Sequence, residues 1–347
     1  MSRRHVPGTL AIATTALFAL SLLAAGSAEG TSRWLRCEYV ESGAPGPADN
    51  LLVITGNDNA QVRREGDLVL VGTSAANGPR DFEAVPCGEE ATVTNLDRIV
   101  YRGAPVAPRN EHQFLLDERE GPLGPGASPE PNDPEIEVEA VLPNQPRAHP
   151  RVQLIAGEGR DDILVDAGTG RLGVSLEPLP GARGFSPDAD LTVAAPPRTV
   201  ELKLHAGGGG DVLDSRLLDR RRGLIRSLLL AGDDGKDTLL GTEREDQLQG
   251  GAGPDRLFGR GGRDFLYPSA GSDITVGGPG ADFISGMRGS AEPDAQPDSY
   301  FGGLGNDYID ARRGGADAIS CGAGTDEAAI DPEDTLRGGR CEHLRGR

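Results

Sequence analysis

Aspartate recurs at every ninth position in the second half of the chain, and this period constrains the fold more than any other feature. Each aspartate is the sixth residue of a unit G-G-x-G-x-D-x-U-x, in which U is apolar; Gly250–Leu257 and Gly277–Ile284 are the clearest examples. Low-complexity sequence would not hold its phase over six consecutive units, so the period predicts a folded repeat. The aspartates in phase are Asp237, Asp246, Asp255, Asp264, Asp273 and Asp282.

The series continues on both sides of this block with altered spacing. After Gly286 an insertion of seven residues delays the next aspartate, and the later ones follow at intervals of nine or ten residues. On the N-terminal side two Gly-rich turns stand apart, Ala156–Asp161 and Ala206–Asp211. These units add six aspartates to the candidate metal ligands: Asp161, Asp211, Asp298, Asp307, Asp317 and Asp326.

The units resemble RTX, or hemolysin-type, calcium-binding repeats over roughly residues 232–331. More loosely, the chain resembles secreted calcium-binding proteins of actinobacteria, which open with a Cys-containing β region and close with a Cys-Gly-x-Gly-x-Asp unit and a Cys-Glu pair. The matching residues are Thr92–Ile99, Cys321–Asp326 and Cys341-Glu342. The resemblance implies an all-β fold, a right-handed parallel β-helix (β-roll), with calcium bound at its turns.

The residue pattern gives a physical reason for such a fold. A Gly-rich turn followed by a short strand folds the chain back every nine residues, so two units make one coil. Glycine at positions two and four supplies positive φ and lets the turn carbonyls face one point. The apolar residue two places after each aspartate is expected to point inward, with Thr275 replacing it in one unit. The expected inner columns are Leu239, Leu248, Leu257, Leu266 and Ile284, continued by Tyr300, Ile309 and Ile319.

Electrostatics indicates why a cation is needed. Same-side aspartates are eighteen residues apart, so Asp237, Asp255 and Asp273 share one edge and the alternate set shares the other. Coils stack about 4.8 Å apart, where two unit charges repel by about 3.5 kcal/mol at an effective dielectric of ~20. Calcium takes about six to eight oxygens, which carboxylates and turn carbonyls supply. The predicted glycine ligands are Gly235, Gly253, Gly262, Gly271, Gly280 and Gly305.

Two consequences are expected. The repeat segment should be disordered or loosely collapsed without calcium and should gain β structure when calcium is added. The alternative is a solenoid that keeps the fold but has lost the metal. Arg244 takes a glycine position in the unit of Asp246, and Thr275 replaces the apolar residue after Asp273, so this alternative applies first to these two sites. Substituting Asp255 or Asp264 by alanine should therefore weaken folding more than Asp246→Ala does.

The rest of the chain divides by composition. Residues 29–118 contain short β-prone runs and predict a β-rich region. Residues 119–150 are rich in Pro, Gly and acid and predict a linker or long loop with one half-buried strand near Val138. Residues 151–231 predict irregular wide coils, and residues 232–347 the β-roll with a disulfide-pinned C-terminal cap. No segment has a helical period, and whether residues 29–150 form a separate domain is open.

The first 28 residues predict an export signal. Arg3 and Arg4 precede an apolar stretch, Leu10–Ala25, and cleavage is expected after Ala28. The alternative is an uncleaved membrane anchor, and the choice between the Sec and twin-arginine routes is open. The expected product is a secreted protein without stable membrane insertion once the signal is removed.

The four cysteines of an exported chain predict disulfides. Three pairings are possible, and we expect Cys37–Cys87 and Cys321–Cys341 because these pairs lie at opposite ends of the chain. The alternative is a zinc site with four cysteine ligands. Such a site would need CxxC-type spacing, which the sequence lacks.

Charge and motifs narrow the function classes. A formal net charge of −19 argues against nucleic acid as a partner. The sequence has no HExxH, GxSxG or Walker motif, so it predicts no catalytic or cofactor-binding residue. The arginines between Arg216 and Arg226 form either a contact for an anionic cell-surface polymer or a solvated loop that offsets nearby acid.

Two functions fit these observations. The first is a secreted, non-catalytic protein that folds around stacked calcium ions. The second is a secreted hydrolase or toxin-like protein that uses the repeats as a calcium-dependent folding module. A hydrolase screen of the purified protein separates the two.

Overall fold

The computed structural model describes much of the chain after residue 34. The described residues are 35–40, 51–56, 59–74, 82–85, 87, 91–92, 98–103, 113–118, 137–142, 150–157, 161–167, 171–175, 191–194, 200–220, 225–286, 296–312 and 314–346. The predicted export signal, its cleavage point after Ala28 and most of the predicted linker lie outside these residues. Within them, no helix is long and apolar enough to cross a membrane.

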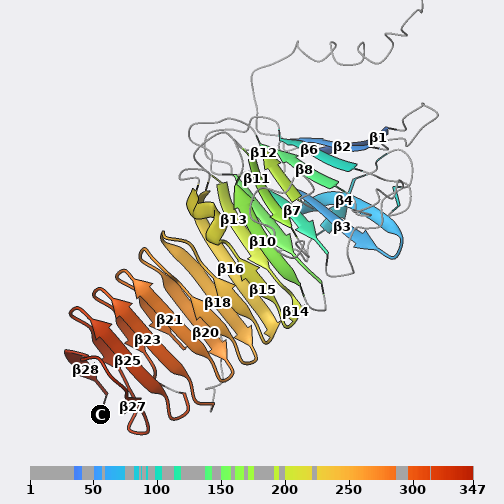
Figure 1. Ribbon diagram of the computed structural model, residues 1–347. Coiled ribbons are helices and arrows are strands. Elements are labelled where there is room, and N and C mark those ends of the chain that lie inside the picture. Colours follow the sequence, from blue (N-terminus) through green and yellow to red (C-terminus); the bar gives the residue numbers. More distant parts are fainter. Residues whose placement is uncertain are drawn as a thin grey trace, which may run out of the picture. The chain divides into compact units, whose positions relative to one another are not determined.

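Two large sheets hold every described strand (Figure 1). The first sheet contains, in spatial order, β1 (Leu35–Val40), β2 (Leu51–Gly56), β6 (Arg98–Gly103), β8 (Glu137–Val141), β12 (Leu191–Ala194), β11 (Arg171–Ser175), β10 (Asp162–Ala167), β15 (Val212–Asp214), β17 (Thr238–Leu240), β19 (Arg256–Phe258), β21 (Ile274–Pro279), β23 (Ser299–Leu304), β25 (Ala318–Ala323) and β27 (Thr335–Leu336).

The second sheet contains, in the same direction, β5 (Phe82–Ala84), β4 (Leu68–Ser74), β3 (Ala60–Glu65), β7 (Gln113–Asp117), β9 (Arg151–Ile155), β13 (Val200–His205), β16 (Ile225–Gly235), β18 (Asp246–Ala252), β20 (Phe265–Ala270), β22 (Phe283–Ser285), β24 (Tyr308–Asp310), β26 (Glu327–Ala329) and β28 (His343–Arg345), with β14 (Gly208–Gly209) beside β16. The one described helix is a 3-10 turn, η1 (Arg216–Arg220), between β15 and β16.

The strands of the repeat region form a parallel β-roll, as the nine-residue period predicts. From β15 onward, odd-numbered strands join the first sheet and even-numbered strands join the second (Figure 1). Each strand pairs in parallel with the strand one coil further on. The register matches inward residues to each other, Leu239 to Leu257 and Leu248 to Leu266. Two nine-residue units therefore make one coil.

The core between the sheets consists of the columns that the sequence identifies. Leu239, Leu248, Leu257, Leu266 and Ile284 are fully buried, and Tyr300, Ile309 and Ile319 continue the columns. Thr275 keeps its inward place and is also fully buried, although its hydroxyl has no hydrogen-bond partner among the described residues. An unsatisfied buried hydroxyl costs about 1–3 kcal/mol, so this unit is a weak point of an otherwise apolar column.

The N-terminal strands join the same two sheets. The β-prone runs near Leu52, Val69 and Val100 form β2, β4 and β6, and the alternating segment around Val138 forms β8. Parallel pairs β2–β6–β8 and β3–β7–β9 extend the sheets, while antiparallel hairpins at β1–β2, β3–β5 and β10–β12 interrupt the simple roll. These hairpins are the irregular part of the fold that a fixed period does not predict.

Both predicted disulfides are present. Cys37 on β1 is bonded to Cys87, and Cys321 on β25 is bonded to Cys341, which precedes β28. All four cysteines are therefore used, and the zinc alternative is wrong. The second bridge ties the segment before β28 to the coil that carries Asp326, and its role as a C-terminal cap stays a prediction.

Breaking this cap should loosen the end of the roll. The Cys321–Cys341 bridge closes a loop with a sequence separation of 20, which restricts the unfolded chain by about 3 kcal/mol. We expect Cys341→Ser to lower the melting temperature in saturating calcium by roughly 5 °C or more, measured by scanning calorimetry. The double variant Cys321→Ser/Cys341→Ser, which leaves no free thiol at this bridge, should melt at the same lowered temperature as Cys341→Ser. An unchanged melting temperature in both variants would contradict a stabilising cap.

Candidate calcium sites

The aspartates of the repeat form two hydrogen-bonded ladders, one at each edge of the roll. In each step, the backbone N–H of one aspartate donates to Oδ1 of the aspartate one coil further on, and the last step of the second row ends on Oε2 of Glu342. The N···O distances are 2.7–3.0 Å. The first row runs through Asp161, Asp211, Asp237, Asp255, Asp273, Asp298, Asp317 and Asp334. The second row runs through Asp246, Asp264, Asp282, Asp307, Asp326 and Glu342.

The ladder hydrogen bonds use Oδ1 of each aspartate and leave the second carboxylate oxygen, Oδ2, for another partner. In six of these aspartates, Oδ2 is buried and accepts no hydrogen bond from the described residues. Buried carboxylate oxygens are normally satisfied, so a repeated orphan oxygen calls for an explanation such as a bound ion. The six residues are Asp237, Asp255, Asp264, Asp282, Asp307 and Asp326.

The first glycine of each unit shows what faces this orphan oxygen. A side chain at Gly277 would lie 2.5 Å from Oδ2 of Asp282 and 2.6 Å from the carbonyl oxygen of Gly302 in the next coil. A side chain at Gly259 would meet Asp264 Oδ2 and the Gly277 carbonyl in the same way. A carboxylate of one turn and a carbonyl of the next thus converge beside a glycine, which leaves no room for a Cβ.

Carbonyls at the fourth position face the following turn. A Cβ on Gly253 would overlap the carbonyl oxygen of Gly235, and a Cβ on Gly305 would overlap that of Gly280. The backbone φ is +118° at Gly253 and +132° at Gly305, so only glycine is free of strain there. These stacked carbonyls and the carboxylates form an all-oxygen set, which suits a hard cation.

The turn conformation persists even where glycine is absent. Asp233, Arg260 and Ser269 occupy the second position of their units with φ of 65°, 78° and 77°. A left-handed non-glycine residue costs roughly 1 kcal/mol. The fold holds three such residues in the same place, so the turn geometry is imposed by the coil and not only by glycine.

Burial controls the charge of the aspartates more than their mutual repulsion does. The pKa of the Asp255 and Asp264 carboxyls is raised to about 8: burial is the largest cause, the ladder N–H lowers the pKa, and neighbouring carboxylates raise it. Burial also raises the pKa to about 6 at Asp237, Asp282 and Asp307. The sequence indicates repulsion between stacked carboxylates, whereas loss of hydration is the larger cause of the raised pKa values.

This electrostatic arrangement predicts an unusual pH response. The raised pKa values mean that the calcium-free folded chain binds more protons than the unfolded chain between about pH 4 and pH 8. Its stability therefore falls as pH rises through this window, by up to ~1.4 kcal/mol per carboxyl per pH unit. We expect calcium-free protein to gain β structure by circular dichroism between pH 8 and pH 5. The variant Asp255→Asn/Asp264→Asn should respond less, and a wild-type signal that weakens on acidification would contradict the assignment.

Two carboxylates are engaged by their own units. Oδ2 of Asp246 accepts hydrogen bonds from the backbone N–H and the hydroxyl of Thr242. Oδ2 of Asp298 accepts a 2.6 Å hydrogen bond from the Tyr300 hydroxyl. The sequence singles out Asp246 as the weaker site because of Arg244, and the structure gives a further physical reason for a difference at that turn.

The structure also brings together residues that the period does not link. Asp161 and Asp211, which the sequence separates as isolated turns, lie on the first ladder directly before Asp237. Asp334 and Glu342 end the two ladders and were missed, because their spacings of 17 and 16 residues fall outside the repeat. The Cys341-Glu342 pair at the end of the chain was the sequence feature that could have identified Glu342 as a ladder residue.

A group of three or more His, Cys, Asp or Glu side chains able to hold a metal does not occur among the described residues. Beside the first glycine of a unit, the turns bring together one carboxylate oxygen and one backbone carbonyl, as at Gly277. Aspartates of one row are linked through backbone N–H groups and not through shared side-chain clusters. Any ion between the turns would depend on main-chain oxygens.

The fold and the turns define a class: a parallel β-roll whose glycine-rich turns present oxygen ligands to cations. Within this class, residues 231–266, 240–275 and 267–290 match the RTX calcium-binding nonapeptide repeat, in four copies. Residues 231–290 therefore contain RTX repeats, which confirms the resemblance seen in the sequence and supports a role in calcium binding. Comparisons with curated proteins and with solved structures give no match.

Proposed function

We propose that the chain is a secreted, non-catalytic protein whose roll folds around calcium ions lying between consecutive turns of each aspartate row. The observation that supports this most is the set of buried Oδ2 atoms that have no hydrogen bond from the described residues, five of which lie with a carbonyl of the next coil beside the first glycine of their unit. The best-formed ligand sets are those of Asp237 and Asp255 in the first row and of Asp264, Asp282 and Asp307 in the second.

The chemistry of the donors favours calcium over other biological cations. Carboxylate and carbonyl oxygens are hard ligands, and a flexible set of them from two coils suits an ion that accepts six to eight neighbours. Magnesium demands octahedral geometry and keeps several waters, whereas zinc and copper prefer imidazole and thiolate ligands. The cysteines are bonded to each other, which leaves no thiolate for a soft metal.

Each part of the turn has its own task in this proposal. The glycines at positions one, two and four bring backbone oxygens close to one another, and the ladder N–H groups fix Oδ1 of each aspartate. Oδ2 is then free to face the ion. A bound calcium ion supplies the positive charge that these buried carboxylates lack in a site shielded from water.

Secretion and the lack of catalysis belong to the same proposal. Two disulfides are typical of oxidising compartments, and the first 28 residues carry the pattern of an export signal. Extracellular calcium concentrations are sufficient for weak sites. The absence of hydrolase and nucleotide-binding motifs in the sequence supports a binding role.

Isothermal calorimetry on the mature chain, residues 29–347, tests the binding role. We expect several calcium ions to bind per chain at up to millimolar concentration, with far weaker binding of magnesium at the same ionic strength. Absence of calcium binding, or equal binding of both ions, would overturn the proposal. Supernatant and cell fractions of the producing organism test secretion separately.

A further inference from the structure

The first turn of the second row, Gly241–Asp246, differs from the turns that follow it. Its fourth position is Arg244, which has no left-handed backbone, and Oδ2 of Asp246 is hydrogen-bonded to Thr242 at 2.5 and 2.8 Å. The later turns of this row have glycine at the fourth position and an orphan Oδ2, as at Asp264 and Asp282. The first turn therefore lacks both features of the proposed calcium ligands.

A positive charge from the chain itself lies between this turn and the next. Arg260, the second residue of the next turn, places its Nη1 2.6 Å from Oδ2 of Asp219 and 3.4 Å from the Gly241 carbonyl oxygen. Its Nη2 lies 2.6 Å from Oε1 of Glu243. The guanidinium thus contacts one turn carbonyl and two carboxylates, which are oxygen partners of the kind that a calcium ion takes.

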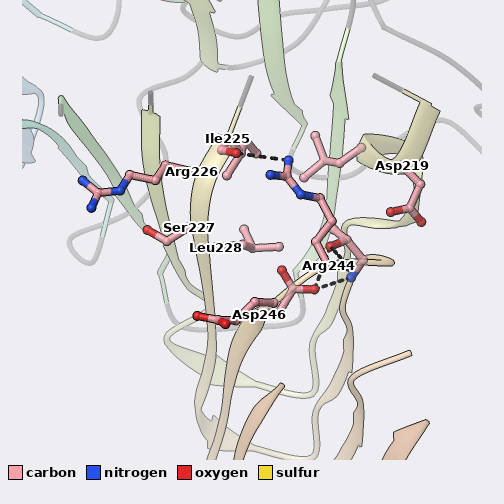
Figure 2. Close-up of a pocket in the computed structure, with 10 residues that line it drawn as sticks. Asp219, Ile225, Arg226, Ser227, Leu228, Arg244 and Asp246 are labelled. Carbon is pink, nitrogen blue, oxygen red and sulfur yellow. Dashed lines mark hydrogen bonds between the residues drawn. The ribbon is translucent and has the colours of Figure 1, made fainter. Parts of the chain in front are cut away.

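An insertion that is not part of the repeat completes this arrangement. Asp219 comes from η1, and its other oxygen accepts the backbone N–H of Glu243 at 2.7 Å. From the same turn, Arg244 reaches the Ile225 carbonyl on β16 at 3.2 Å, while Asp246 turns back toward its own loop (Figure 2). Side chains therefore link the turn to η1, to β16 and to the following turn, in addition to the backbone hydrogen bond from the Gly261 N–H to the Thr242 carbonyl.

We propose that the Arg260 guanidinium takes the place of calcium between the first two turns of the second row. This inference rests on the calcium role proposed above and divides the roll into two parts. The two neighbouring coils that contain β16 and β18 are held together at the second row by these fixed charges and keep their structure without calcium. The coils from β20 onward depend on calcium.

This division gives the roll a direction of assembly. Each new strand pairs in parallel with the strand one coil earlier, so β20 needs an ordered β18 to pair with. Repeat arrays form by adding units to an existing neighbour, and the first ordered coil is the costly step. A coil that Arg260 holds without calcium supplies that template, and calcium then drives the addition of later coils.

Hydrogen exchange of the mature chain with peptide-level resolution tests the inference. In chelator, wild-type β18 amides should exchange at least about tenfold more slowly than those of β20, β22 and β24. Arg260→Gln should abolish this difference in chelator and keep full protection in calcium, which shows that the variant folds. Arg260→Lys should retain part of the protection because it keeps the charge.

Arg263→Gln is the matched control, since Arg263 lies in the same turn with its guanidinium over the Phe265 ring. It should behave like the wild type. If wild-type β18 and β20 exchange equally fast in chelator, or if Arg260→Gln retains the wild-type difference, the inference is wrong while the calcium role stands. If β20, β22 and β24 stay protected in chelator, the calcium role itself fails.

Discussion

Removal of calcium from the mature chain will unfold the coils that follow β18. At a calcium concentration 100-fold above the dissociation constant, each site contributes about 2.7 kcal/mol to folding. Three or more sites therefore match the whole stability of a typical domain, about 5–15 kcal/mol. The buried carboxylates, with pKa values raised to about 8 at Asp255 and Asp264, cannot remain charged in these coils without a cation.

Far-UV circular dichroism with excess chelator, followed by millimolar calcium, measures this transition. We expect most of the β signal of the repeat coils to disappear and then return. Sodium or magnesium at matched ionic strength should not restore it, because screening alone does not supply ligands. The same β spectrum in chelator and in calcium would contradict the prediction.

Asp264→Asn should have opposite effects with and without calcium. The amide keeps an oxygen that accepts the Asp246 N–H, so the ladder survives, but the negative charge is lost. In calcium, loss of a charged ligand should cost about 3 kcal/mol and raise the calcium concentration for half-maximal folding more than tenfold. In chelator at pH 8 the variant should retain more β structure than the wild type, because it has one buried carboxylate fewer to neutralise.

Asp246→Asn is the matched control for this experiment. Its Oδ2 is already bonded to Thr242, and the Arg260 guanidinium lies beside its turn. We expect a calcium midpoint within about twofold of the wild type. Equal shifts for the two variants would show that Oδ2 of Asp264 has no special role.

The repeat region was predictable because its nine-residue period determines which residues point inward and which edge of the roll each aspartate occupies. A nine-residue unit with an apolar eighth position fixes which residues point inward, and Leu248 and Leu257 are fully buried as expected. The same period assigns successive aspartates to alternate edges, where they form the two ladders. The cysteines at opposite ends of the chain were also paired correctly.

The other features depend on contacts between segments with no common period. Parallel strands such as β7 and β9 join across a long connection, and no local pattern identifies their partners. Asp219 reaches the turns only because η1 folds back beside β16, and this insertion occurs once. The ladder hydrogen bond to Oδ1 was also missed, because it follows from coil stacking and not from residue type.

A crystal structure of the mature chain grown in calcium, with anomalous scattering to locate the ion, tests the central claim most directly. We predict anomalous peaks between consecutive turns of both rows, each in contact with Oδ2 of a ladder aspartate such as Asp255 or Asp282 and with glycine carbonyls of the adjacent coil. Peaks confined to the outer surface, or turns that hold water in place of calcium, would contradict the account.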